Sequence, residues 1–302
     1  MGRMTDSFAQ ASGADRLLVF SIPSRHARGR VVRLESVLGE ILSAHDYPPP
    51  IARMLSEALT VTALVGALLK DEGSQLTMQA EADRGPVRLL VCDWRDGELR
   101  GYAEFSPEEL AETGQSPRLE DLFCDGRLVV TFEMPTRRER YQGIVPLEGH
   151  SLCDALENYF ARSEQVPTLL RVAVDLDGGQ PIAGGLLLQH VAEGEEGGER
   201  LHARVARPEW EHVAIMGSSI SAEELTDRSL SLETISWRLF HEDGDIRVMP
   251  GASIRRGCRC SIAHFDEVLA RFPKEDRREM ADENGIIRVD CAFCSRQFAI
   301  QD

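Results

Sequence analysis

Lysine is nearly absent from the 302-residue chain, which holds two, Lys70 and Lys274, among its 34 basic residues. Neither follows a Gly-x-x-x-x-Gly run, so the chain has no phosphate-binding P-loop. Long apolar runs are missing as well, because the longest one, residues 58–69, is well short of the roughly 20 residues that cross a bilayer. Residues 1–13 are polar and lack the apolar segment of a secretory signal. These absences predict a cytoplasmic protein with no membrane partner.

Positive charge is in deficit, with 34 basic against 50 acidic residues and a formal net charge of −16. Such a surface repels phosphate backbones, so no nucleic-acid partner is expected. Residues 251–302 carry nine residues of each sign, which places the whole excess in residues 1–250. This change in charge predicts a domain boundary near residue 250.

No constellation of an enzyme stands out. The glycine pairs at 178–179 and 184–185 lack the Gly-x-Gly-x-x-Gly arrangement of a dinucleotide site. His150 and Cys153 are three residues apart at a predicted helix start, but no third group orients them as a base and a nucleophile. We therefore expect no catalytic residue and no organic cofactor, and interpret the chain as a protein that is not an enzyme.

The first 192 residues predict an α+β domain in which helices pack on a sheet. Apolar residues at helical spacing predict helices over 36–45, 50–70 and 151–162, with Ser36 and Ser151 as N-caps. Strands are predicted by period-two runs and intervening turns, over residues 76–80, 87–91, 99–105, 128–132 and 143–147, and in a hairpin of 169–176 with 185–191. Strands in runs with few helices are typical of the α+β class.

Residues 193–250 predict a mostly helical, metastable linker between two domains. Positions 193–199 are rich in glycine and glutamate and indicate a loop. Helices are expected over 199–216 and 221–228, and a short apolar segment over 235–240. The apolar content is too low for a core of its own.

The strongest signal lies in residues 251–302, where four of the seven cysteines cluster. Cys258 and Cys260 form a C-x-C pair, and 30 residues later Cys291 and Cys294 form a C-x-x-C pair. In a reducing compartment, two close cysteine pairs supply the four thiolates of a tetrahedral structural zinc site. We predict one zinc ion per chain, in a small zinc-binding domain. His264 could replace a ligand but is expected to lie at the start of a helix.

Between the cysteine pairs, helices are expected over 265–272 and 274–283, followed by a turn at 284–285 and a strand over 286–289. A unit of this size cannot bury much apolar surface and needs a cross-link, such as a bound metal ion, to be stable. The other three cysteines are isolated among apolar neighbours and are expected in the core: Cys92, Cys124 and Cys153.

Two interpretations of the cluster remain open, a permanently structural zinc ribbon and a redox-active site. The two sulfurs of the C-x-C pair can form a tight disulfide once a metal is lost. Arg255, Arg256 and Arg259 surround this pair and either raise its thiolate fraction or simply add solubility. A thioredoxin-type enzyme would need a βαβ context around the C-x-x-C pair, which is missing.

Beyond the cysteines, segments along nearly the whole chain resemble a known family in order. These segments are HDYP at 45–48, YQGIVPLEG at 141–149, NYFARSEQVPT at 158–168, AGGLLLQ at 183–189 and WRLFHE at 237–242. Together with the C-x-C and C-x-x-C pairs, they are similar to the 33-kilodalton redox-regulated heat-shock chaperonin family. Residues 81–86 depart from the more glycine-rich turn of that family.

The resemblance implies a cytoplasmic, ATP-independent chaperone that holds unfolding client proteins. In such proteins the reduced form binds zinc through the four cysteines and is inactive. Oxidation then pairs Cys258 with Cys260 and Cys291 with Cys294, releases zinc and unfolds the zinc domain and the linker. The oxidised protein is expected to be a homodimer that binds clients and prevents aggregation. The alternative function is a structural zinc-ribbon module that binds a nucleic acid or a protein partner.

Overall fold

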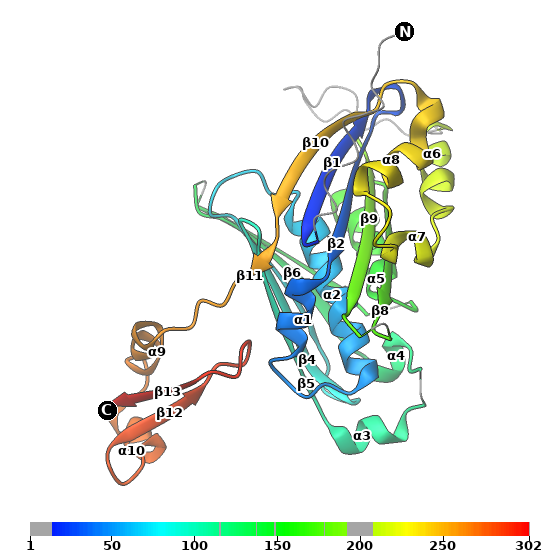
Figure 1. The fold of residues 1–302 in the computed structure, drawn as a ribbon. Coiled ribbons are helices and arrows are strands. Elements are labelled where there is room, and N and C mark those ends of the chain that lie inside the picture. Colours follow the sequence, from blue (N-terminus) through cyan, green and yellow to red (C-terminus); the bar gives the residue numbers. More distant parts are fainter. Residues whose placement is uncertain are drawn as a thin grey trace.

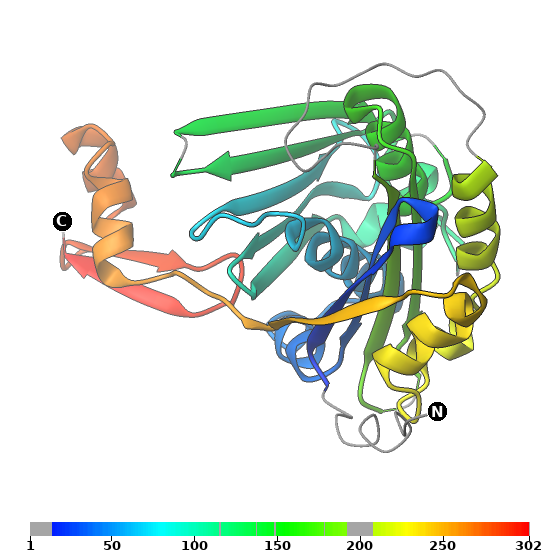
Figure 2. The same ribbon diagram turned by 90° about the horizontal axis from the view of Figure 1, so that it is seen from above.

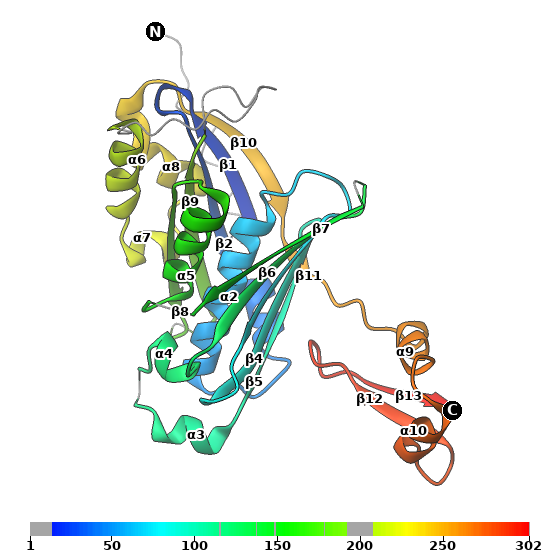
Figure 3. The same ribbon diagram turned by 180° about the vertical axis from the view of Figure 1, so that it is seen from behind.

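The computed structural model of the protein describes residues 14–301, apart from positions 115, 137, 148 and 178 and the segment 192–207. Its two larger sheets belong to one body, and a small module at the C-terminus stands beside that body (Figures 1 and 3). The fold is mixed α+β, as the sequence predicts.

The first sheet has five strands, in the spatial order β10 (Arg247–Ser253), β1 (Arg16–Ile22), β2 (Ala27–Leu34), β9 (Ile182–His190) and β8 (Thr168–Asp175). The second has six, in the order β11 (Arg255–Arg256), β5 (Glu98–Phe105), β4 (Val87–Arg95), β3 (Gln75–Glu81), β6 (Arg127–Met134) and β7 (Glu139–Pro146). All neighbouring strands are antiparallel except β11 and β5. The hairpin predicted from the sequence is confirmed as β8 and β9.

The helix α2 (Pro49–Gly66) lies between the two sheets and packs against both of them (Figure 2). Pro49 occupies its first turn, where a missing N–H costs no hydrogen bond. The helix is buried nearly all round, and its threonines stay satisfied because Thr60 and Thr62 donate to the carbonyls of Ser56 and Ala58. Around α2 the inward residues of both sheets form the main core.

Shorter helices complete this half of the chain. They are α1 (Ser36–Leu42), α3 (Pro107–Glu112), α4 (Leu119–Leu122), α5 (Leu152–Tyr159) and the turns η1 (Pro23–Arg25) and η2 (Phe160–Glu164). Ser151 caps α5 as predicted. The prediction that Ser36 caps the first helix is wrong, because Glu35 is the N-cap residue of α1. The carboxylate of Asp15 instead accepts the backbone N–H groups of Glu35 and Val37.

The predicted linker covers the outer face of the five-stranded sheet. Its helices are α6 (Pro208–Ser218), α7 (Ala222–Thr226) and α8 (Leu232–Phe240), followed by η3 (His241–Asp243). Val213 and Phe240 are buried there with sheet residues such as Leu188, and the rings of Phe240 and Phe20 lie 5.8 Å apart. The loop predicted over 193–199 and the first part of the helix predicted over 199–216 lie outside the described residues.

In the two larger sheets, the β1–β2 hairpin, β10 and β11 were not predicted. The β1–β2 hairpin precedes the first predicted element, and β10 crosses the boundary expected near residue 250. From β10, which pairs with β1, the chain runs into β11, which pairs with β5. A single segment therefore joins the linker, both sheets and the C-terminal module.

The C-terminal module consists of α9 (Ile262–Leu269), α10 (Lys274–Met280), β12 (Ile286–Asp290) and β13 (Gln297–Gln301). Ser261 accepts the N–H of His264, so this histidine lies in the first turn of α9 as expected. The two strands form an antiparallel pair. Of the two, only β12 was predicted. Leu269, Ile287 and Ile300 form its small buried core.

Candidate metal centre and its contacts with the core

The module brings all four predicted cysteine ligands together. Their Sγ atoms lie within 4.8 Å of one another. Elsewhere in the described residues, no group of three or more histidine, cysteine or acidic side chains lies this close together. The Sγ of Cys258 lies 3.2 Å from that of Cys260 and 3.6 Å from that of Cys291. The Sγ atoms of Cys260 and Cys294 are 3.4 Å apart.

Two different turns present the sulfurs. The first pair follows β11 directly, and the second lies in the loop that joins β12 to β13. In that loop the carbonyl of Cys291 accepts the N–H groups of Cys294 and Ser295, at 3.2 and 2.8 Å. The N–H of Cys291 donates to the carbonyl of Arg296 and closes the turn. Ser295 takes a left-handed conformation with φ of 54°, which lets the chain reverse here.

A tetrahedral zinc ion fits this donor set. Zinc–thiolate bonds of about 2.3 Å place the sulfurs of a tetrahedron about 3.8 Å from each other, near the distances found here. Four thiolates fill the shell and leave no open position, which is the arrangement of a structural site rather than a catalytic one.

The thiols of the cluster differ in acidity. Burial raises the pKa of the Cys291 thiol and raises that of Cys260 much further. Burial works against ionisation of Cys294 too, but the N–H of Arg296 and the neighbouring thiols donate to its sulfur and lower its pKa to about 7. A cation bound among the sulfurs would favour the thiolate forms of Cys260 and Cys291, whose pKa values burial raises.

The sequence left open whether Arg255, Arg256 and Arg259 act on these thiols, and the structure gives two of them partners in the six-stranded sheet. Arg255 pairs with Glu98 of β5, and Arg259 donates to Oε1 of Gln75 in β3 at 2.5 Å. The pKa of Cys260 is raised by burial and by hydrogen bonds with the other thiols, not lowered by these guanidinium groups. Arg255 and Arg259 therefore contact the six-stranded sheet.

The residues between the paired cysteines dock the module on the core. The ring of Phe293 meets that of Tyr102 edge to face, with centroids 4.9 Å apart. The guanidinium carbon of Arg100 lies 4.0 Å from the centre of the Phe293 ring. His45 Nε2 lies 2.8 Å from the carbonyl oxygen of Ala292. These contacts could not be predicted from the sequence, since no local pattern links Phe293 to β5.

The other three cysteines lie away from the cluster. Cys92 and Cys153 are buried as expected, and burial raises the pKa of both thiols. The expectation for Cys124 is wrong, because this residue is exposed. It lies in an isolated bridge with Arg84 at the surface of the sheet.

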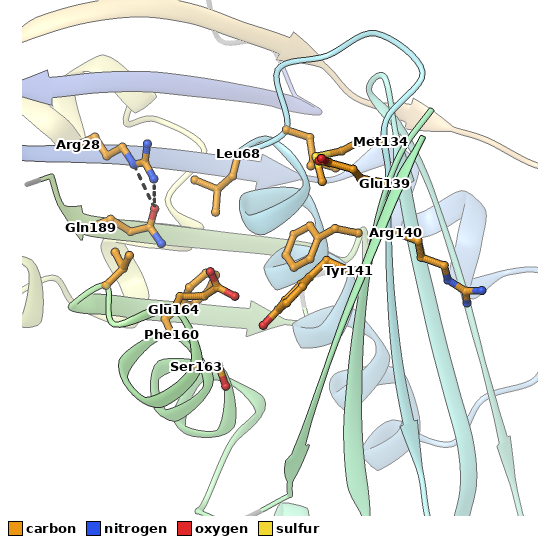
Figure 4. A pocket seen from close by; sticks show the side chains of 13 residues that line it. Arg28, Leu68, Met134, Glu139, Arg140, Tyr141, Phe160, Ser163, Glu164 and Gln189 are labelled. Carbon is orange, nitrogen blue, oxygen red and sulfur yellow. Dashed lines mark hydrogen bonds between the residues drawn. The ribbon is translucent and has the colours of Figure 1, made fainter. Parts of the chain in front are cut away.

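The two longest segments of the family resemblance meet at a cleft of about 650 Å³ between the sheets (Figure 4). Tyr141 comes from β7, while Phe160 and Glu164 come from η2. Behind them the buried Tyr159 donates to Oε1 of Glu164 at 2.8 Å. A Cβ atom on Gly143 would lie 2.3 Å from the Tyr159 ring, so glycine is required for this packing. The segments therefore have a structural reason to resemble the family.

Comparison with known proteins agrees with these observations. A sequence model of the family described as Hsp33 protein matches residues 15–301. The chain belongs to the Hsp33 family. A 33 kDa chaperonin of Caulobacter vibrioides is 40% identical over 294 residues, covering 95% of this chain and 94% of that protein. The Shigella boydii 33 kDa chaperonin is 33% identical over 285 residues, covering 94% and 91%.

The fold is that of the family as well. A crystal structure of the 33 kDa chaperonin, or heat shock protein 33 homolog, of Thermotoga maritima superposes with a TM-score of 0.76 at 21% identity and covers 95% of each chain. Hsp33 proteins are chaperones and not enzymes, and a chaperone role follows for this chain. No helix in the described part of the molecule is long and apolar enough to span a membrane.

Proposed function

We propose that the protein is an oxidation-activated holdase whose four clustered cysteines bind one zinc ion and form its redox switch. The observation that carries this proposal is the placement of four sulfurs within 4.8 Å across 30 intervening residues. In the reduced state the cluster holds both ends of the module together. The cytoplasm, whose thiols are kept reduced, is the compartment in which such a switch stays off.

The module depends on this link because its apolar core is very small. Its three buried aliphatic side chains contribute about 1.5–3 kcal/mol each. A structural zinc site contributes roughly 10–16 kcal/mol of apparent binding free energy. The metal is therefore the larger contribution to the stability of the module.

Oxidation replaces this long-range link with two local bonds. Each cysteine pair gives two electrons to an oxidant such as peroxide, and with two protons the peroxide becomes two molecules of water. The new disulfides join Cys258 to Cys260 and Cys291 to Cys294, which removes all four thiolate donors. Closing loops of three and four residues contributes about 1.6 and 1.9 kcal/mol in the chain-entropy estimate. Neither bond connects the two pairs.

Unfolding of the module then destabilises the linker, because β10 and β11 connect the linker helices directly to the module. The helices α6, α7 and α8 are 11, 5 and 9 residues long and depend on packing against the sheet for their stability. Their release uncovers apolar side chains for unfolding client proteins. The oxidised form is proposed to act as a homodimer and to need no ATP.

An aggregation assay tests this function directly. A heat-denatured client is mixed with the reduced, zinc-loaded chain or with the chain after treatment with peroxide and mild heat. We expect suppression of light scattering by the oxidised chain and not by the reduced one, with Cys124→Ser behaving like the wild type. Equal suppression by both forms would show that the redox switch is wrong while leaving the chaperone role intact.

A further inference from the structure

The outer face of the six-stranded sheet, which faces away from α2, carries a row of mostly apolar side chains. The register of the strands places one residue from each of five neighbouring strands in line. In the order β5, β4, β3, β6 and β7, these residues are Tyr102, Val91, Gln79, Val129 and Ile144. With strands about 4.8 Å apart, the row is about 19 Å long.

A polar row runs beside it and holds one arginine in place. Asp93 is 3% exposed and accepts from the hydroxyl of Thr77 at 2.7 Å and from Nε of Arg100 at 2.7 Å. The Arg100 guanidinium is therefore fixed beside Tyr102, two residues further along β5. Together, the ring and the guanidinium form a rigid seat for an aromatic side chain.

Phe293 of the metal loop occupies this seat. Its ring lies against Tyr102 edge to face and over the Arg100 guanidinium, as described above. Both contacts are geometries that attract aromatic rings. The apolar row continues from the seat across the sheet to Ile144, whose side chain at the far end is 61% exposed. The docking interface of the module is thus continuous with a longer apolar surface.

We propose that the seat formed by Tyr102 and Arg100 binds an aromatic side chain of an extended client segment, and that Phe293 occupies it in the zinc-bound form. This inference rests on the proposed function and names one client-contacting site within it. The partner is an unfolded polypeptide with a Phe, Tyr or Trp followed by further apolar residues. Its ring takes the place of the Phe293 ring, and its next apolar side chains lie along the row.

The geometry suits a partner of this chemistry. In an extended chain, residues i and i+2 point the same way and are about 6.8 Å apart, so three such side chains fit within the length of the row. The surface contacts aromatic rings and apolar groups and does not require a particular amino-acid sequence. Because Phe293 is tethered to the same molecule, it competes at a high effective concentration while the module is folded.

Binding of defined peptides tests the seat. The probe is a dye-labelled decapeptide of alternating Ser and Phe, and its control is the same peptide with Ser in place of every Phe. Fluorescence anisotropy is measured with the full chain, zinc-bound or oxidised. We expect the oxidised wild type to prefer the Phe peptide and Tyr102→Ala to weaken its binding about fivefold. Tyr141→Ala, which changes an exposed tyrosine on the opposite face, should bind like the wild type.

A second variant reports on the seat without changing the sheet. The zinc-bound Phe293→Ala chain should bind the Phe peptide at least tenfold more tightly than the zinc-bound wild type, because its seat is open. Equal binding of the Phe peptide by oxidised wild type and oxidised Tyr102→Ala would overturn the proposal, as would the absence of any gain in Phe293→Ala. If the oxidised wild type suppresses aggregation in either case, the proposed function survives and only the seat is wrong.

Discussion

Replacing one metal ligand should unfold the C-terminal module while leaving the two larger sheets intact. Cys260→Ser keeps the size of the side chain but removes a thiolate from the cluster. The remaining apolar core, Leu269, Ile287 and Ile300, contributes about 5–9 kcal/mol against roughly 10–16 kcal/mol from a structural zinc. If the substitution removes even about 4 kcal/mol, the open fraction of the module rises about 1000-fold.

Limited proteolysis with trypsin measures this opening. The module offers cleavage sites in and around its two helices and on β12, namely Arg271, Lys274, Arg277, Arg278 and Arg288. In Cys260→Ser we expect rapid cleavage at these sites and protection of the two larger sheets. Wild-type protein treated with a chelator should give the same pattern.

The matched control is Cys124→Ser, which changes an exposed cysteine outside the cluster and should leave the cleavage rate unchanged. Equal resistance of the Cys260→Ser and wild-type modules to trypsin would contradict this prediction. It would mean that the apolar core and the contacts with the six-stranded sheet hold the module without the full ligand set.

Three further predictions concern the larger body. Gly143→Ala should destabilise it by about 1–3 kcal/mol in thermal unfolding, because the added Cβ overlaps a buried ring, while Gly114→Ala has open space and should be neutral. Phe240→Ala should cost about 3–5 kcal/mol of local stability and speed hydrogen exchange in α8 but not in α2. If exchange in α8 is no faster in Phe240→Ala than in the wild type, or rises equally in α2, the linker does not open independently. Burial raises the pKa of Glu57, so the acid form is favoured in the folded state and stability is lost as pH rises through that pKa. Glu57→Gln should therefore gain stability over wild type as pH rises from about 4 to 8, and Glu40→Gln at the surface should show no such trend in urea unfolding.

The metal ligands could be predicted from sequence because the cysteines of each pair are close together in the chain. Each cysteine pair lies within four residues, so a single turn is enough to present both sulfurs. The strands β3 to β7 were also predicted, since one face of that sheet is buried. Leu76, Met78 and Ala80 of β3 point into the core and alternate with half-exposed polar residues.

The β1–β2 hairpin was missed because both of its faces are covered. β2 is buried at seven of its eight positions and shows no alternation. Arg30 and Arg33 interrupt its apolar pattern, yet both are buried, with Arg30 donating to the carbonyl of Ala67 and Arg33 to that of Leu230. These partners lie 37 and 197 residues away, and no local pattern reveals them.

β10 escaped prediction for a different reason. It contains Pro250 and Gly251, which normally argue against a strand. It is an edge strand, however, and a proline can lie there with its nitrogen away from the sheet. The seat of Phe293 on Tyr102 was equally hidden, since it joins two elements that meet only after both have folded.

In the proposed switch, disulfide formation and loss of the metal are one event. Zinc release, followed with a chromophoric chelator during peroxide treatment, and thiol counting on the same samples test it most directly. We expect one zinc released per chain as four thiols disappear, with Cys258, Cys260, Cys291 and Cys294 consumed at the same rate. Release of zinc with all four thiols still free, or loss of the thiols with zinc retained, would contradict it.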